Sequence, residues 1–239
     1  MRIKIEQAEF LKALNFSNKS LLSKANLPIL SNVLIDASSQ KLEIMTTNLE
    51  TATKVSAACK IEAEGKTTVL GRALFEYVSQ LPEGELLIEK LGEELVVTLG
   101  GYSSRFATMG AEEFPAIPKI KGEKTLTFKS DEFLKGVSLV VFNAALDESR
   151  PILTGVLAVY SKGRLEIVAT DGYRLGHLEI AAVSKDSEQI SLIIPSKSLL
   201  EVAKIVSEFG DDKEGSELKM IVADNLSQIN FKIGNVEYT

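Results

Sequence analysis

The sequence predicts an α+β fold built as a tandem repeat, with the helices of each copy on one face of antiparallel sheets. Three observations support this prediction. The chain contains an internal repeat, each copy has many short alternating segments typical of strands, and each copy has only two segments with helical periodicity. Long runs of strands with few helices are typical of α+β proteins, whereas parallel α/β folds alternate strand and helix.

The repeat aligns the chain with itself at an offset of 123 residues, so that Pro28-Ile29-Leu30 falls on Pro151-Ile152-Leu153. From position 28 to position 48 there are 10 identities in 21 positions, where average composition would give about one or two. At an offset of 125, Ala73–Glu76 falls on Ser198–Glu201. Two copies of one structural unit therefore account for the chain.

Each copy predicts the same order of elements. An opening strand is expected at 2–5 and 125–128, and a helix follows whose apolar stripe is Phe10, Leu11 and Leu14 or Phe133, Leu134 and Val137. Next come hairpins with short polar turns, at 32–37 with 41–46 and at 155–160 with 164–169. A longer strand, a second helix at about 72–80 or 197–209, and two or three strands complete each copy.

The boundary between the copies is predicted at 113–122, because Pro115 and Pro118 disfavour helix and a central strand. We therefore expect a first domain at 1–122, including this linker, and a second domain at 123–239. Aligning Ile233-Gly234 with Leu99-Gly100 places Thr239 near Arg105. The second copy is thus expected to stop near its last strand, as a piece of a longer protein would.

Composition narrows the function classes. Hydrophobic residues make up 45% of the chain, no apolar run approaches the ~18 residues of a membrane span, and the N-terminus alternates like a strand. The single cysteine, Cys59, predicts a reducing cytoplasm, and its segment predicts a buried residue in an alternating strand. A formal net charge of -6 means that DNA binding cannot be argued from total charge.

No catalytic, metal or cofactor site is expected. His177 has no sequence-level partner for nucleophilic or metal chemistry, and Gly100-Gly101 is interpreted as a hairpin turn without a phosphate-loop lysine. The segment Asp211–Gly215 lacks the ligand spacing of a calcium loop, which predicts a solvated turn. An enzyme is therefore disfavoured.

Three segments resemble the bacterial DNA polymerase III beta subunit family, the DNA sliding clamps: Leu165–Leu175, Asn26–Asn32 and Gln80–Gly84. The resemblance spans the whole chain and implies the DNA-clamp fold, with sheets outside and helices lining the inner face. It implies three such domains per chain, of which the third is absent here, and a homodimeric head-to-tail ring for the full-length form. The implied partners are double-stranded DNA, bound without sequence preference, the replicative polymerase, the clamp loader and other clamp-binding proteins. A duplicated protein-binding scaffold without a DNA role is the alternative.

A sliding clamp must attract phosphates without reading bases, which requires basic side chains on the helical face. Lys12 and Lys135 occupy the same repeat position on the first helices, and Lys197 and Lys204 belong to the second helix of copy two. By resemblance, Lys24 and Arg72 match basic DNA contacts. Solvated faces of amphipathic helices are the alternative explanation. Where the family has a polar DNA contact before Pro151, this chain has Asp147 and Glu148, and this departure weakens the prediction of a DNA contact in that loop.

By resemblance, a groove for linear peptide motifs lies in the second domain, at Leu153, Thr170, Gly172, Tyr173, Arg174 and Leu175. Gly172 would permit a positive φ, the leucines would supply apolar walls, and Arg174 could pair with a peptide carboxylate or carbonyl. A plain hairpin turn at Asp171-Gly172 is the alternative. Tyr173 replaces the histidine frequent in the family. The copy-one equivalent, Asn48-Leu49-Glu50, lacks the glycine and arginine, so the groove is expected in copy two only, and in partial form.

Overall fold

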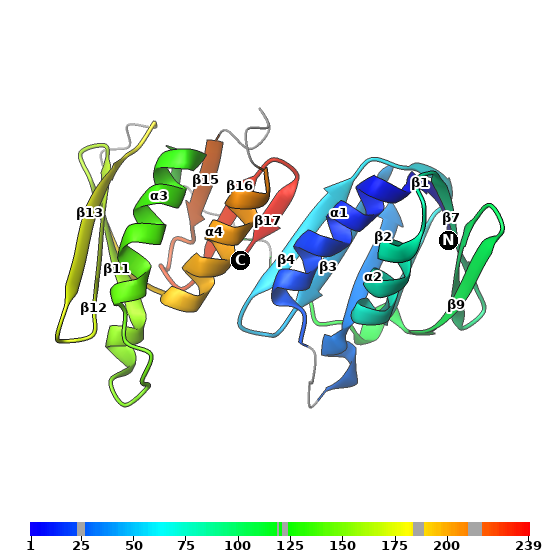
Figure 1. The fold of residues 1–239 in the computed structure, drawn as a ribbon, viewed down its shortest axis with the longest axis horizontal. Helices are drawn as coiled ribbons and strands as arrows, with labels where there is room; N and C mark the ends of the chain where they lie inside the picture. Colours follow the sequence, from blue (N-terminus) through cyan, green and yellow to red (C-terminus); the bar gives the residue numbers. More distant parts are fainter. Residues whose placement is uncertain (23–26, 119, 121–123, 184–188, 210–216) are drawn as a thin grey trace. The chain divides into compact units, whose positions relative to one another are not determined.

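A computed structural model describes residues 1–239 except 23–26, 119, 121–123, 184–188 and 210–216. The chain divides into two compact units, Met1–Pro118 with Asn235–Tyr238 and Lys119–Gly234 with Thr239 (Figure 1). The last strand of the chain is thus counted with the first unit. None of the described helices is long and apolar enough to cross a membrane.

The first unit follows the predicted order of elements. Its helices are α1 (Gln7–Ser17) and α2 (Gly71–Gln80). Its strands are β1 (Arg2–Glu6), β2 (Asn32–Ser38), β3 (Lys41–Thr47), β4 (Ala52–Ala57), β5 (Lys60–Ala63), β6 (Gly65–Leu70), β7 (Glu85–Leu91), β8 (Glu94–Leu99), β9 (Tyr102–Met109) and β17 (Val236–Tyr238). A 3-10 turn, η2 (Pro28–Ser31), precedes β2, and another, η3 (Ala111–Glu113), follows β9. Strand β17 pairs antiparallel with β4, with Glu237 opposite Lys54.

The second unit repeats this plan. Its helices are α3 (Ser130–Val140) and α4 (Ser196–Phe209), and the 3-10 turns η4 (Val141–Asn143) and η5 (Pro151–Thr154) lie between α3 and the first hairpin. Its strands are β10 (Lys124–Lys129), β11 (Gly155–Ser161), β12 (Arg164–Thr170), β13 (Leu175–Ala181), β14 (Ile190–Pro195), β15 (Glu217–Val222) and β16 (Ile229–Ile233). The described strand pairs of both units are antiparallel, as the sequence predicts.

The sequence repeat is also a repeat of strand register. In the first unit β2 pairs with β6 so that Leu34 lies opposite Thr68, and β3 pairs with β2 so that Met45 lies opposite Leu34. In the second unit Leu157 lies opposite Ile193 and Val168. These are the positions that offsets of 123 and 125 predict, so residues equivalent in sequence are equivalent in the sheet.

The helices of each unit pack side by side on the sheet (Figure 1), because each has one apolar face. Phe10 and Leu14 of α1 are buried, as are Phe133 and Val137 of α3, while Lys12 and Lys135 point to the exposed side. The predicted helix-on-sheet layout is confirmed.

One prediction about the fold is wrong. Cys59 lies in the connection between β4 and β5, not in a strand, and it is half-buried. The alternation that predicted a strand continues through Ala58 and Cys59, but the chain leaves the sheet at Ala57 to reach β5, which pairs with β1. Burial raises the pKa of the Cys59 thiol. The segment 211–215, predicted as a solvated turn, lies outside the described residues.

Candidate DNA-facing and partner-docking sites

The basic residues predicted to face DNA lie on exposed surface of the helices. Lys12 on α1 and Lys135 on α3 hold equivalent positions, and Lys197 and Lys204 lie on α4. Arg72 is the second residue of α2. Lys24 falls outside the described residues.

Several of these cations have carboxylate neighbours. Arg72 Nε lies 2.8 Å from Glu76 Oε1, and this hydrogen bond raises the pKa of Arg72. Lys204 Nζ lies 2.7 Å from Glu201 Oε1, and Lys197 Nζ lies 3.5 Å from Glu148 Oε1. Ion pairs between exposed side chains contribute little to stability, because solvent and salt screen them. These carboxylates therefore hold their cations only weakly.

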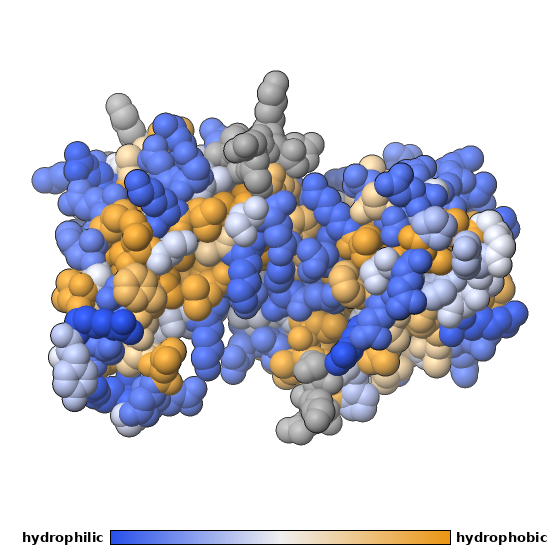
Figure 2. Space-filling model, viewed as in Figure 1, coloured by the Kyte–Doolittle hydropathy of each residue, from blue (hydrophilic) through white to orange (hydrophobic). Residues whose placement is uncertain are grey.

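The helical face of the second unit is not purely basic. Figure 2 shows hydrophobic atoms gathered over α3 and α4, and the exposed apolar side chains there include Leu139, Phe142 and Leu200. The sequence did not predict this surface. Apolar residues at helical spacing are expected to be buried, and only the fold shows which of them no other segment covers.

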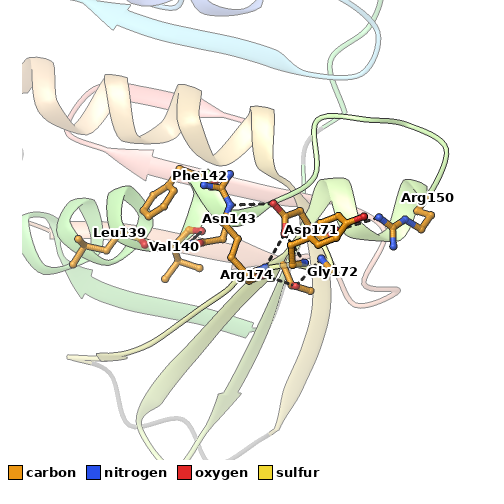
Figure 3. Close-up of polar contacts among 10 residues, drawn as sticks. Leu139, Val140, Phe142, Asn143, Arg150, Asp171, Gly172 and Arg174 are labelled. Carbon is orange, nitrogen blue, oxygen red and sulfur yellow. Dashed lines mark hydrogen bonds and ion pairs between the residues drawn. The ribbon is translucent and has the colours of Figure 1, made fainter.

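The turn between β12 and β13 is held by its own side chains (Figure 3). Asp171 Oδ1 accepts hydrogen bonds from the backbone N–H of Tyr173 at 2.9 Å and of Arg174 at 3.0 Å, which hold the pKa of Asp171 below its ordinary value. Thr170 Oγ1 accepts from the Gly172 N–H and donates to the Arg174 carbonyl. Gly172 has a φ of +92°, as the sequence predicts. The residues 170–174 form what we call the turn site.

Arg174 is held in one orientation by three contacts. Its Nε lies 3.0 Å from Asp171 Oδ2, its Nη2 donates to the Phe142 carbonyl at 2.7 Å, and its guanidinium lies 5.5 Å from the centre of the Phe142 ring. A cation over an aromatic face and a charge-assisted hydrogen bond both favour this placement. Two of its nitrogens are therefore occupied within the unit, and Arg174 is a fixed rather than a free side chain.

Sequence reasoning missed two residues of this arrangement. Phe142 and Arg150 are far from the turn in sequence, but Arg150 Nη2 donates to the Asp171 carbonyl at 3.1 Å. Figure 3 shows the guanidinium groups of Arg150 and Arg174 on opposite sides of the turn. The only signal in the sequence was the position of Arg150 next to Pro151, where the first copy has Leu27.

The remaining predicted groove residues surround the turn on open surface. Tyr173 is 96% exposed and Leu175 64% exposed, while Leu153 and Thr170 are half-buried. The exposed apolar area next to a fixed arginine is typical of a surface that receives a partner.

The first unit contains the same turn. Asn48 Oδ1 accepts from the Glu50 and Thr51 N–H groups, and Thr47 Oγ1 accepts from Leu49 and donates to the Thr51 carbonyl. Leu49 has a φ of +74° despite its side chain. The turn itself is therefore common to both copies, and what distinguishes the second is the arginine pair and the Phe142 ring.

No group of three or more His, Cys, Asp or Glu side chains that could hold a metal ion occurs within the described residues. His177 lies on β13 with Nε2 2.9 Å from Glu166 Oε1 across the strand pair, on an exposed sheet face. Gly100-Gly101 forms the hairpin turn between β8 and β9.

Comparison with known proteins matches both units to domains of one family. Residues 1–118 match the family model described as DNA polymerase III beta subunit, N-terminal domain, and residues 127–239 match the model described as its central domain. The beta sliding clamp of Streptococcus pneumoniae is 32% identical over 238 residues, which covers 96% of this chain and 61% of that protein. That of Synechocystis is 27% identical and covers 100% of this chain and 65% of its own length.

Solved structures agree. The DNA polymerase III subunit beta of Pseudomonas aeruginosa has a TM-score of 0.91 at 25% identity, covering 100% of this chain and 63% of that one. The Bacillus subtilis sliding clamp has a TM-score of 0.92 at 23% identity, with the same coverage, and shows the fold. The chain spans less than two thirds of the length of these relatives. Because the two family models together cover nearly all of both units in order, the chain belongs to the DNA polymerase III beta subunit family, the beta sliding clamps.

Proposed function

We propose that this chain supplies two modules of a ring that encircles duplex DNA and tethers the replicative polymerase and other DNA-processing proteins. The observation that carries the proposal is the duplicated helix-on-sheet unit with Lys12 and Lys135 exposed at equivalent positions. Its family membership supports the same function. In the full-length form we propose a head-to-tail homodimer, loaded by a clamp loader, acting in the cytoplasm and without catalysis.

The DNA part of the proposal rests on loose attraction between helical cations and phosphates. Each phosphate contact that is lost should reduce the slope of log K against log salt by about 0.9. We therefore expect the double reversal Lys12→Glu with Lys135→Glu to weaken salt-dependent binding to a DNA duplex, measured by fluorescence anisotropy. A matched control, Lys41→Glu with Lys162→Glu, makes the same charge change at exposed hairpin positions. Equal losses in both double variants would contradict a specific role for the helical face.

The partner part rests on the turn site. A polymerase-derived clamp-binding peptide should bind the chain in calorimetry, and Arg174→Ala with Leu175→Ala should abolish that binding, because these changes remove both the fixed guanidinium and an exposed apolar wall. Leu49→Ala with Glu50→Ala, in the equivalent turn of the first unit, is the matched control and should leave affinity unchanged. Unchanged affinity in the Arg174 and Leu175 variant would refute the assignment.

A duplicated protein-binding scaffold without a DNA role is the second candidate, favoured by the exposed apolar surface over α3 and α4. It predicts peptide binding without salt-sensitive DNA association. The anisotropy measurement separates the two functions.

A further inference from the structure

We infer that three carboxylates beside the helical cations, those of Glu76, Glu148 and Glu201, set how long a DNA phosphate stays bound to this chain. We call them the competing carboxylates. The inference rests on the proposed function, since it concerns DNA attracted by the same cations, and it deepens that function by naming residues that weaken the contact. The cations supply the attraction, and the carboxylates supply rapid release.

Two of the competing carboxylates occupy one repeat position. The offset of 125 that aligns the second helices places Glu76 on Glu201. It also places Arg72 on Lys197. Glu76 Oε1 lies 2.8 Å from Arg72 Nε, and Glu201 Oε1 lies 2.7 Å from the Nζ of Lys204, about one turn further along α4. A carboxylate beside a helical cation is therefore a repeated feature of α2 and α4.

Helix stability does not explain where the cations are. Arg72 and Lys197 are each the second residue of their helix, and neither first turn contains an acidic residue. The positive end of the helix macrodipole lies there, so a cation at this position opposes the dipole. The order of Arg72 and Glu76 is also the less favourable one, because a carboxylate on the N-terminal side of the cation stabilises a helix more. These positions suit an external anion better than they suit the helix.

Glu148 adds a third contact from a different element. It lies in the loop before η5, and its Oε1 is 3.5 Å from Lys197 Nζ, with the two side chains 80% and 89% exposed. The family resemblance implied a polar DNA contact in this loop. An acidic residue there repels a phosphate and competes for the neighbouring lysine. The departure from the family pattern thus has the same consequence as the two helical carboxylates.

The charges of the four helices are nearly balanced. Helices α1 to α4 contain five Lys or Arg residues and six Asp or Glu residues. Helices that only attracted DNA would carry an excess of cations, because affinity rises with each phosphate that a cation neutralises. A balance of charges instead favours contacts that form and break quickly.

The contacts show how a carboxylate competes. Glu76 accepts from one of the five N–H donors of Arg72, so a phosphate oxygen can approach the other nitrogens while the carboxylate stays in place. Two anions on one guanidinium repel each other, which weakens the phosphate contact. The carboxylate is tethered one turn away and the phosphate is not, so the carboxylate recaptures the cation whenever the duplex moves. A bound duplex should therefore exchange phosphates rapidly, as sliding requires.

The test replaces Glu76 and Glu201 with glutamine in the whole chain. Glutamine keeps the size and helix propensity of glutamate but is not an anion. We expect the double variant to bind a DNA duplex about tenfold more tightly at low salt. The slope of log K against log salt should steepen by up to about 1.8, because each cation released to a phosphate contributes about 0.9. Fluorescence anisotropy measures both quantities, and stopped-flow dissociation should be slower.

Glu94→Gln with Glu179→Gln is the matched control. Glu94 holds Arg105 at 2.8 Å in the first unit, and Glu179 holds Arg164 at 2.6 Å in the second, and these exposed pairs lie on strands rather than helices. The control makes the same change in net charge and should leave the slope unchanged. Glu148→Gln is an independent single variant and should steepen the slope by up to about 0.9. It keeps the inference testable if the double variant does not fold.

Two results would overturn the inference alone. One is an equal gain in the double variant and in the control, because net charge would then explain both. The other is duplex binding whose slope and dissociation rate neither the double variant nor Glu148→Gln alters. If no variant binds the duplex even at low salt, the DNA part of the proposed function fails together with the inference. Binding of the polymerase-derived peptide at the turn site should be unchanged in the double variant, so that failure there is recognised separately.

Discussion

Replacing Gly172 with alanine tests whether the turn site depends on a backbone conformation that only glycine adopts without strain. Gly172 has a φ of +92°, and a Cβ added there would lie 3.1 Å from Arg150 Nη1. The left-handed region costs an L-residue about 1–2 kcal/mol. Alanine also reduces the entropy of the unfolded chain, which offsets about 0.4–1 kcal/mol of this cost. The net expectation is a destabilisation of the second unit by about 1 kcal/mol.

Urea unfolding measures this change. For a slope of about 2 kcal/mol/M, the midpoint of the second unit's transition should fall by about 0.5 M. Because the chain has two units, each transition must be followed separately. Tryptophan is absent, so Phe209→Trp, at a buried position of α4 outside the turn site, is introduced into every variant as a probe of the second unit. Affinity for the polymerase-derived peptide should fall in parallel, because Arg174 and Tyr173 both depend on the turn.

Two other glycines separate the cost of a positive φ from the cost of the close contact with Arg150. Gly92 also has a positive φ, of +61°, but an added Cβ would meet nothing within 4 Å, whereas Gly101 has neither the positive φ nor a close neighbour. Their alanine variants, each with a Trp probe in the first unit, should show the backbone cost alone and no cost, respectively. A neutral or stabilising Gly172→Ala, or an equal loss in Gly101→Ala, would refute the reasoning.

Three further predictions follow from single contacts. Asp171→Asn should preserve the turn, since Asn48 holds the equivalent turn, but should lower peptide affinity because it releases Arg174. The pKa of Asp171 is lowered in the folded chain, so the stabilising effect of its carboxylate is present above the ordinary pKa and is lost as pH falls through the folded pKa. Peptide affinity measured below pH 4, with Asp171→Asn as the reference, checks this expectation. Lys66→Met should destabilise the first unit by about 1 kcal/mol, because it leaves buried Asp36 without its 2.7 Å partner. Since the hydrogen bond to Asp36 raises the pKa of Lys66 above 10.5, this contribution is complete at neutral pH and is lost only as pH rises through the folded pKa, so alkaline unfolding curves of the two proteins should converge. In the folded chain at neutral pH, Cys59 should react with iodoacetamide more slowly than a free thiol, because burial raises the pKa of Cys59. In urea the two thiols should react at the same rate. If Cys59 already reacts as fast as a free thiol in the folded chain, its half-buried placement is contradicted.

The sequence by itself determined the repeated unit and its local elements. The hairpins β2–β3 and β11–β12 follow from alternating apolar residues around short polar turns, and the helices from apolar residues at helical spacing, so both could be located within one or two residues. Such patterns depend on neighbours along the chain. The same local logic failed at Cys59, where alternation continued but the strand did not.

Only the tertiary structure decided what the candidate sites are made of. Arg150, Phe142 and Arg174 meet because η4, the segment before η5 and the β12–β13 turn are brought together by folding, and no spacing along the chain encodes that meeting. Likewise Ile29 and Ile152 are the same residue in the same motif, yet one is buried and the other exposed. Exposure depends on which other segment covers a surface, a property of the folded chain that a local pattern cannot contain.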